Sequence, residues 1–163
     1  MRRLALLSAL LLALAVCRAD AAADSAECRR WRDAFSSMPF RMVTIQRGQH
    51  TVAFRVKVAQ SSDQQAGGFQ CATREEIDRH VILFDFGQEI ITQFHMQNVP
   101  AALDIAFVKA DGRIFSILKM PPSPTVLYGP MGTFRYAIEA RAGFFESHGI
   151  RPGEARLLMP APR

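Results

Sequence analysis

Alternating hydrophobic and polar positions predict a β-hairpin near the start of the chain. From residue 51 to 59, hydrophobic side chains point one way, and Arg55 and Lys57 point the other way. This period of two residues is typical of a half-buried strand. A shorter strand is expected over 42–47, and Gly48-Gln49 between the two segments is a turn signal.

A continuous hydrophobic run, rather than an alternation, marks residues 81–86. A strand without a polar face is expected at the centre of a sheet, where both faces are buried. Residues 89–96 are predicted to form the next strand. Asp111-Gly112 is a strong hairpin signal and predicts paired strands over 103–120.

Short helices are predicted before and between these strands. Residues 27–35 would place two aromatic side chains on one helical face. Ser62-x-x-Gln65 and Thr73-x-x-Glu76 both resemble capping boxes, which start helices. Gly67-Gly68 indicates either an early helix end or a close approach of two backbone segments.

The last part of the chain returns to strands. Four prolines between 120 and 130 exclude an interior strand and predict an ordered loop that could cover a groove. Strands are expected over 134–141 and 155–159, with a helical turn over 143–148. No regular helices separate the strands. The pattern therefore predicts a mainly β (α+β) fold, a compact antiparallel β-barrel or sandwich of about seven strands with one or two short helices.

The N-terminus has the pattern of a secretory signal peptide. Two arginines precede a hydrophobic run that is too short to span a bilayer, and Ala19-Asp20-Ala21 is a cleavage signal. We therefore expect residues 1–21 to be removed and the protein to be periplasmic or secreted, with no transmembrane segment after cleavage. Residues 22–41 would form an N-terminal extension, and 42–163 a single β-rich domain.

Charge and cysteine content narrow the possible partners. Cleavage would remove three of the 20 Lys and Arg residues and one of the 15 Asp and Glu residues, so the net charge falls from +5 to about +3. The basic residues are dispersed, which argues against nucleic acid as a partner.

Cys28 and Cys71 remain after cleavage. An oxidising compartment favours a disulfide between them, and the alternative is a catalytic thiol at Cys71.

A series of short motifs runs along the chain in a fixed order. They are Val56-Lys57-Val58-Ala59, Gly68-Phe69-Gln70, Val81-Ile82-Leu83-Phe84, 94–99, 103–108, 111–114, 138–143 and Gly153-Glu154. Their order resembles the domain-of-unknown-function 192 family of bacteria and archaea, over about residues 52–159. The resemblance implies a compact β-rich fold, often exported, whose activity is undefined.

Four positions depart from the pattern of this family. His95 stands where the family has Trp, Gln97 replaces Lys, Val99 replaces Thr, and Glu154 replaces the closing Asp. If the family has a site there, the site in this chain has lost cationic and aromatic groups. Either its ligand differs, or an activity has lapsed.

Asp104 is the charged residue that most needs an explanation. It lies between Leu103 and Ile105 in a predicted strand, where an unpaired carboxylate is costly. A two-residue turn at Asp111-Gly112 would place Lys119 opposite it, which gives a cross-strand ion pair. The other interpretation is a general base or ligand anchor with a raised pKa.

Other polar residues gather near the same motif. His95 and Asn98 could contact a ligand, or could be an ordinary surface residue and a turn cap, respectively. Glu139 is expected to pair with the arginines on its strand face, unless it acts as a second carboxylate beside Asp104. The ligand-binding candidates are His95, Gln97, Asn98, Asp104, Glu139 and Tyr128.

The sequence contains no complete catalytic constellation. No spacing of His, Cys and carboxylate residues matches a metal site, and no cofactor is expected. The sequence favours a non-catalytic binding or accessory module for a small molecule, glycan or envelope protein. The alternative is an acid/base hydrolase that uses Asp104 with His95 or Glu139. Whether the protein is an enzyme is left open.

Overall fold

The computed structural model describes residues 25–159, so the predicted signal peptide lies outside the described residues. Within that range no helix is both long and hydrophobic enough to cross a membrane. The elements in chain order are α2 (Ala26–Ser37), β1 (Phe40–Arg47), β2 (His50–Ala59), α3 (Ser62–Gly67), α4 (Arg74–Arg79), β3 (Ile82–Ile90), β4 (Phe94–His95), β5 (Leu103–Val108), β6 (Ile114–Met120), β7 (Leu127–Tyr128), β8 (Phe134–Arg141), α5 (Phe144–Ser147) and β9 (Ala155–Leu158).

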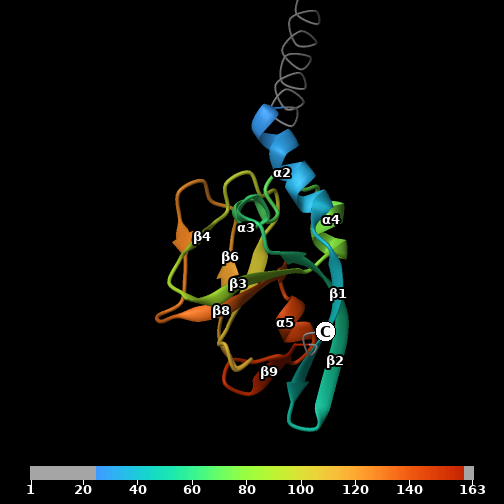
Figure 1. Cartoon of the computed structure of the whole chain (residues 1–163), viewed down its shortest axis with the longest axis vertical. Coiled ribbons are helices and arrows are strands. Elements are labelled where there is room, and N and C mark those ends of the chain that lie inside the picture. Colours follow the sequence, from blue (N-terminus) through green and yellow to red (C-terminus); the bar gives the residue numbers. More distant parts are fainter. Residues whose placement is uncertain (1–24, 160–163) are drawn as a thin grey trace, which may run out of the picture.

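Seven strands form one curled sheet in the order β6-β5-β8-β3-β2-β1-β9, and β4 pairs with β7 in a separate small sheet (Figure 1). All neighbours in the large sheet are antiparallel except β2 and β3. The two edges approach each other, because the Leu157 N–H donates to the Gly112 carbonyl at 2.7 Å. The sheet is therefore a half-barrel, and the predicted mainly β fold with a few short helices is confirmed.

The sheet separates two hydrophobic cores. The inner core fills the curl of the sheet and includes Phe145 of α5. Helix α5 lies within the curl in Figure 1. The outer core lies on the opposite face of β3, β5 and β8. It is covered by α2, by the segment that holds α3 and α4, and by the small sheet. Its largest buried side chains are Phe69, Phe84, Phe107 and Phe134.

The predicted helices are present, and one start needs correction. α2 covers the predicted residues 27–35 and buries Trp31 and Phe35. α4 starts with the predicted Thr73 and Glu76 capping box. The capping box of α3 uses Ser61 and Gln64, one residue earlier than predicted. Both boxes satisfy backbone N–H groups that the first helical turn would otherwise leave unpaired.

The predicted strand over 89–96 is wrong. β3 continues to Ile90, the next three residues are irregular, and β4 contains only Phe94 and His95. The chain leaves the large sheet because Phe94 packs on the outer face, with its ring centroid 5.2 Å from that of Phe84. The Pro-rich segment predicted as a loop supplies β7, the partner of β4.

The predicted β5–β6 hairpin is confirmed, but its turn has three residues instead of two. Lys109 and Arg113 flank the turn, and Gly112 adopts a φ of 88°. This is the three-residue turn that ends in a left-handed glycine. A bulge between Phe107 and Val108 absorbs the extra residue, so Asp104 still faces Lys119 as predicted.

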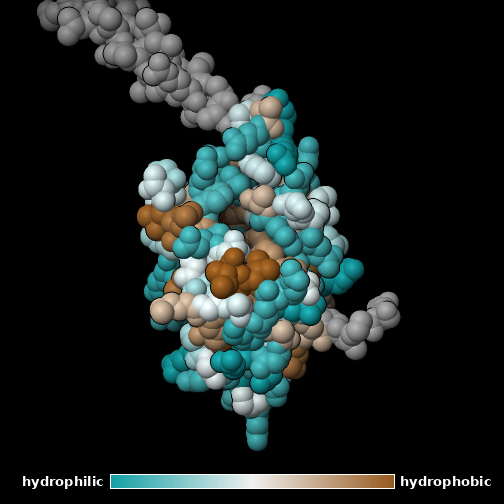
Figure 2. Space-filling view, turned by 60° about the vertical axis from the view of Figure 1, so that its left-hand side comes forward, coloured by the Kyte–Doolittle hydropathy of each residue, from teal (hydrophilic) through white to brown (hydrophobic). Residues whose placement is uncertain are grey.

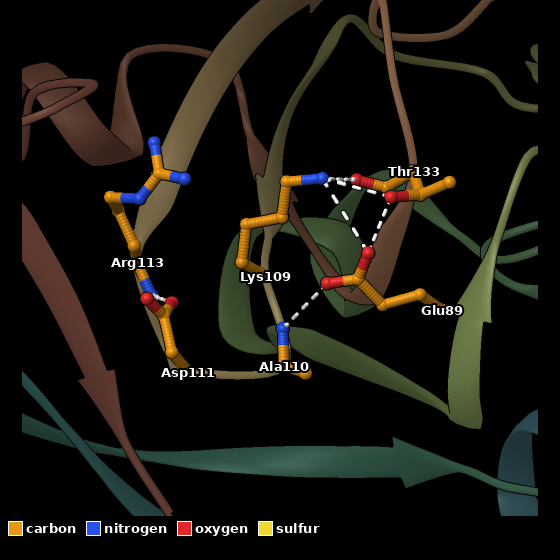
Figure 3. A network of polar contacts seen from close by, with 6 residues as sticks. All are labelled: Glu89, Lys109, Ala110, Asp111, Arg113 and Thr133. Carbon is orange, nitrogen blue, oxygen red and sulfur yellow. Dashed lines mark hydrogen bonds and ion pairs between the residues drawn. The ribbon is translucent and has the colours of Figure 1, made fainter.

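A polar network ties this turn to two other segments (Figure 3). Glu89 of β3 accepts from the Ala110 N–H at 3.2 Å and from the Thr133 hydroxyl. Lys109 Nζ donates to both the carbonyl and the hydroxyl of Thr133 and lies 3.6 Å from Glu89. The network holds the end of β3, the β5–β6 turn and the start of β8 together.

Cys28 of α2 and Cys71 form a disulfide, as predicted, across a sequence separation of 43 residues. Cys71 follows α3, so the bond fixes α2 to the segment that covers the outer core. The Arg32 Nε–H also donates to the Cys71 carbonyl, at 3.2 Å. The N-terminal extension is therefore anchored on the domain by covalent and polar contacts.

Reduction of this disulfide should destabilise the protein by roughly 3–4 kcal/mol, because the loop that it closes loses its constraint in the unfolded chain. The measurement is urea unfolding of a chain that begins at residue 22, with and without dithiothreitol. A Cys28→Ser/Cys71→Ser variant is the control and should match the reduced protein under both conditions. Equal stability of the oxidised and reduced forms would contradict this expectation.

Candidate functional site

Glu139 lies at the centre of the outer face of the sheet. On β8 it is flanked by Ile82 of β3 and Ile105 of β5. The residue is only 4% exposed, and among residues 25–159 its side chain makes no hydrogen bond or ion pair. A buried carboxyl group without a partner is costly, so its position needs an explanation.

The predicted ion pairs between Glu139 and the arginines of its strand face are wrong. Arg135 Nε instead lies 3.7 Å from Asp85 Oδ1. Arg141 is exposed at the end of β8, and its guanidinium donates to the Ala142 carbonyl at 3.4 Å. Arg135 and Glu139 are four residues apart along an extended strand, so their Cα atoms are about 13 Å apart. Side chains that stand perpendicular to the sheet do not meet across this distance.

Burial raises the pKa of Glu139 to about 8, and no charged neighbour contributes to this shift. At neutral pH the group therefore holds a proton and can donate a hydrogen bond. It becomes a carboxylate if a cation is placed against it. A titratable group of this kind in a pocket is a candidate functional residue.

Glu139 lines a pocket of about 250 Å³ on the outer face. The pocket has hydrophobic walls of four phenyl rings and a polar rim. Exposed hydrophobic residues lie beside it near β4 and β7, on the side that comes forward in Figure 2. The walls are formed by Phe69, Phe84, Phe86 and Phe94, and the polar lining by Gln65, Gln70, Thr92, Gln93, His95 and Glu139.

Gly68 makes the closest backbone approach to Glu139. It caps α3 with φ 49° and ψ −125°. A Cβ at this position would lie 3.3 Å from Glu139 Oε2 and 3.4 Å from Phe84 Cζ. The paired glycines therefore both end the helix and let the backbone pass over the carboxyl group, which agrees with the two readings of this motif in the sequence.

Two glutamines in the pocket are held by their amide nitrogens. Gln70 is buried and donates to the Ala66 carbonyl at 2.9 Å, and Gln65 donates to the Asp85 carbonyl at 2.9 Å. Among residues 25–159, no hydrogen bond is made to the amide oxygen of either side chain. Both oxygens are available as acceptors.

Asp104 does not join this site. It faces Ala140 across β5 and β8, and therefore lies on the opposite face of the sheet from Glu139. Its Oδ2 accepts from the Gly143 N–H at 2.8 Å, which ties β5 to the start of α5. Burial raises its pKa, while the bond from Gly143 and the charge of Lys119 oppose the rise.

The structure divides the remaining candidates. His95 lies on the rim of the Glu139 pocket, whereas Gln97 and Asn98 follow it in an exposed turn. Asn98 has a left-handed backbone (φ 57°), which suits Asn, and its carbonyl accepts from the Cys71 N–H at 2.8 Å. Tyr128 Oη donates to the Pro121 carbonyl at 3.1 Å, inside the Pro-rich segment.

A family model described as an uncharacterised ACR, domain of unknown function 192, matches residues 43–156. The chain belongs to this family. This match confirms the resemblance found in the sequence. Among curated proteins, none matches.

Two solved structures of the same fold are similar to this DUF192 chain. A candidate transcription regulator from Sinorhizobium meliloti is 26% identical, with a TM-score of 0.68, over 75% of this chain and 95% of that one. A protein of unknown function from Novosphingobium aromaticivorans is 25% identical, also with a TM-score of 0.68, over 76% of this chain and 88% of that one.

The motifs by which the chain resembles the DUF192 family meet at the Glu139 pocket. Four of those segments, 68–70, 81–84, 94–99 and 138–143, each supply lining residues. Of the four departures from the family pattern, His95 and Val99 line the pocket. Gln97 and Glu154 do not line it, so the departures change only part of the wall.

The sequence did not predict that glutamines and phenylalanines line a pocket. They come from three short segments, 65–70, 84–86 and 93–94, which only the folded chain brings together. The one local signal was Gly67-Gly68, because paired glycines indicate that two segments approach closely.

Gly68→Ala should destabilise the protein by more than Gly48→Ala. Both glycines have a positive φ, so each substitution strains the backbone by about 1 kcal/mol or more. A Cβ at Gly48 would meet nothing within 4 Å, whereas one at Gly68 would press on Glu139 and Phe84. Urea unfolding of the two variants measures the difference. Equal losses of stability in the two variants would show that the segment around Gly68 can move away from Glu139.

Glu139→Gln should remove a pH dependence of stability. The pKa of Glu139 in the folded protein, about 8, lies above the ordinary value of 4.5. The contribution of Glu139 to the free energy of unfolding is therefore fully present below pH 4.5. It is lost as the pH rises to about 8, by about 1 kcal/mol per pH unit. Urea unfolding from pH 5 to 9 should show this slope in the wild type relative to Glu139→Gln. Parallel curves would contradict it.

Proposed function

We propose that this protein is an exported, non-catalytic binding module that holds a small molecule in the Glu139 pocket. One observation carries the proposal: a carboxyl group that is 4% exposed and has no partner among residues 25–159 lines a pocket walled by phenyl rings. Small-molecule sites typically combine hydrophobic walls with a few polar groups that fix orientation.

The energetic argument supports a ligand. Burial of an unpaired carboxyl group opposes folding, and a glutamine or leucine at this position would avoid much of that penalty. Functional sites often contain such unfavourable arrangements, because a ligand supplies the missing partner. Asp104 offers the contrast, since it bonds to the Gly143 N–H and supports the fold.

The geometry does not favour the acid/base hydrolase that uses Asp104. Asp104 and Glu139 lie on opposite faces of the sheet, so they cannot act on one substrate atom. His95 also lines the Glu139 pocket and not the separate pocket beside Asp104. Export is supported by the signal-peptide pattern and by the Cys28–Cys71 disulfide, which suits an oxidising compartment.

A thermal-shift screen of the oxidised chain from residue 22 tests the proposed function. The panel contains amines, sugars, peptidoglycan fragments, nucleotides and divalent metals. A ligand at one hundred times its Kd should stabilise the protein by about 2.7 kcal/mol. Glu139→Gln should reduce this shift, and Asp104→Asn, on the opposite face, should keep it. A shift lost only in Asp104→Asn would place the site on the opposite face of the sheet. The absence of any shift would contradict the proposal of a small-molecule binding module.

A further inference from the structure

We propose that the ligand of the Glu139 pocket is a small organic cation whose ammonium group pairs with the Glu139 carboxylate. This inference rests on the proposed function and names the chemical class of its ligand. It follows from the charges that the pocket lacks, the acceptors that it offers and the rings that form its walls.

The pocket contains a buried acid, and no Lys or Arg among residues 25–159 lines it. The nearest buried cation in the same row across the sheet is Lys57, which is separated from Glu139 by Ile82. Lys57 Nζ donates to the Phe35 carbonyl at 2.9 Å and lies 4.5 Å from the centroid of the Phe35 ring, so it is already occupied. A cation for Glu139 must therefore come from outside the described protein.

The remaining polar groups suit an ammonium donor. The amide oxygens of Gln65 and Gln70 accept no hydrogen bond from residues 25–159, and an ammonium group has three N–H donors and no acceptor. Charge-assisted hydrogen bonds of this kind are stronger than neutral ones. The two amide oxygens would repel an anionic ligand, and such a ligand could accept a hydrogen bond from Glu139 only while the carboxyl group keeps its proton.

The walls suit the rest of such a ligand. Phe69, Phe84, Phe86 and Phe94 line the pocket. Phenyl rings attract cations to their negative faces and also remove hydrophobic surface from water. A volume of about 250 Å³ is slightly below the roughly 300–1,000 Å³ of pockets for drug-sized ligands, so the ligand is small.

Binding of a cation should be coupled to loss of the Glu139 proton. The free carboxyl group holds a proton below a pKa of about 8. An alkyl amine keeps its own charge to about pH 10, as lysine does. When the ammonium group enters, the Glu139 proton leaves to solvent, and N–H···O contacts replace the O–H bond. Affinity should therefore fall about tenfold for each pH unit below 8, because only the ionised fraction binds.

Other titratable groups near Glu139 do not produce the same slope. His95 is exposed on the rim and accepts from the Gln97 N–H at 3.3 Å. On β3, Asp85 is held by Arg135, and on β5 Asp104 points to the opposite face. His95 is the titratable side chain on the rim itself, so its effect must be separated from that of Glu139. A His95→Gln variant separates this effect and should keep the slope up to pH 8.

The experiment compares n-butylammonium with its uncharged analogue 1-butanol. Titrations of the oxidised chain from residue 22, followed by two-dimensional ¹H–¹⁵N NMR, are run at pH 6, 7, 8 and 9. Butylammonium should shift the amides of Gly67, Gly68 and Phe94, with an apparent Kd about fifty-fold weaker at pH 6 than at pH 8. 1-Butanol should bind more weakly and without a pH slope.

Glu139→Gln should weaken butylammonium binding at pH 8 at least tenfold and abolish the slope. Glu146→Gln, at an exposed carboxylate on the opposite face, is the matched control and should change neither the affinity nor the pH slope.

Equal, pH-independent binding of both probes would overturn the cation assignment and leave the binding module in place. If butylammonium leaves the pocket amides unshifted at every pH while another compound from the thermal-shift screen shifts them, the cation assignment also fails. If no compound shifts them, both proposals fail.

Discussion

The structure depends on burial of both faces of its central strands. The curl of the sheet buries one face of β3, β5 and β8 around the inner core, but it leaves the other face open. That outer face is hydrophobic and must be covered by elements that are not part of the sheet. α2, the α3–α4 segment and the small β4–β7 sheet provide this cover. The Glu139 pocket lies where two of the covering segments, 65–70 and 92–99, meet over β3 and β8, so the site is a consequence of how the second face is closed.

The two buried carboxyl groups show how the same sheet can use acidic residues differently. Asp104 and Glu139 lie on neighbouring strands and are almost equally inaccessible, at 3% and 4% exposure. Asp104 is bonded to the backbone N–H of Gly143, which fixes the start of α5 in the inner core. Glu139 has hydrophobic neighbours on both sides in the sheet and glycine backbone above it. Burial raises the pKa of both, but among residues 25–159 Asp104 Oδ2 accepts a hydrogen bond and the Glu139 side chain accepts none.

Features with a local physical cause could be predicted from the sequence. The Thr73 and Glu76 capping box, the β1–β2 hairpin and the limits of β8 depend on neighbouring residues, and all three are present. The strand expected over 89–96 failed because Phe94 is drawn to rings of distant strands. The ion pairs expected for Glu139 failed for a similar reason. Alternation places Arg135, Glu139 and Arg141 on one face, but it cannot show that other segments cover only the middle of that face.

The cover over Glu139 is held in place by contacts at Cys71. The disulfide joins this residue to α2, the Arg32 Nε–H donates to its carbonyl, and its own N–H donates to the Asn98 carbonyl. Cys71 lies three residues beyond Gly68, which approaches Glu139, and the Asn98 turn follows His95 on the rim of the pocket. The crosslink thus anchors two of the walls to the same helix. A domain of this kind can keep a buried carboxyl group unpaired because the segments around it cannot easily collapse onto it.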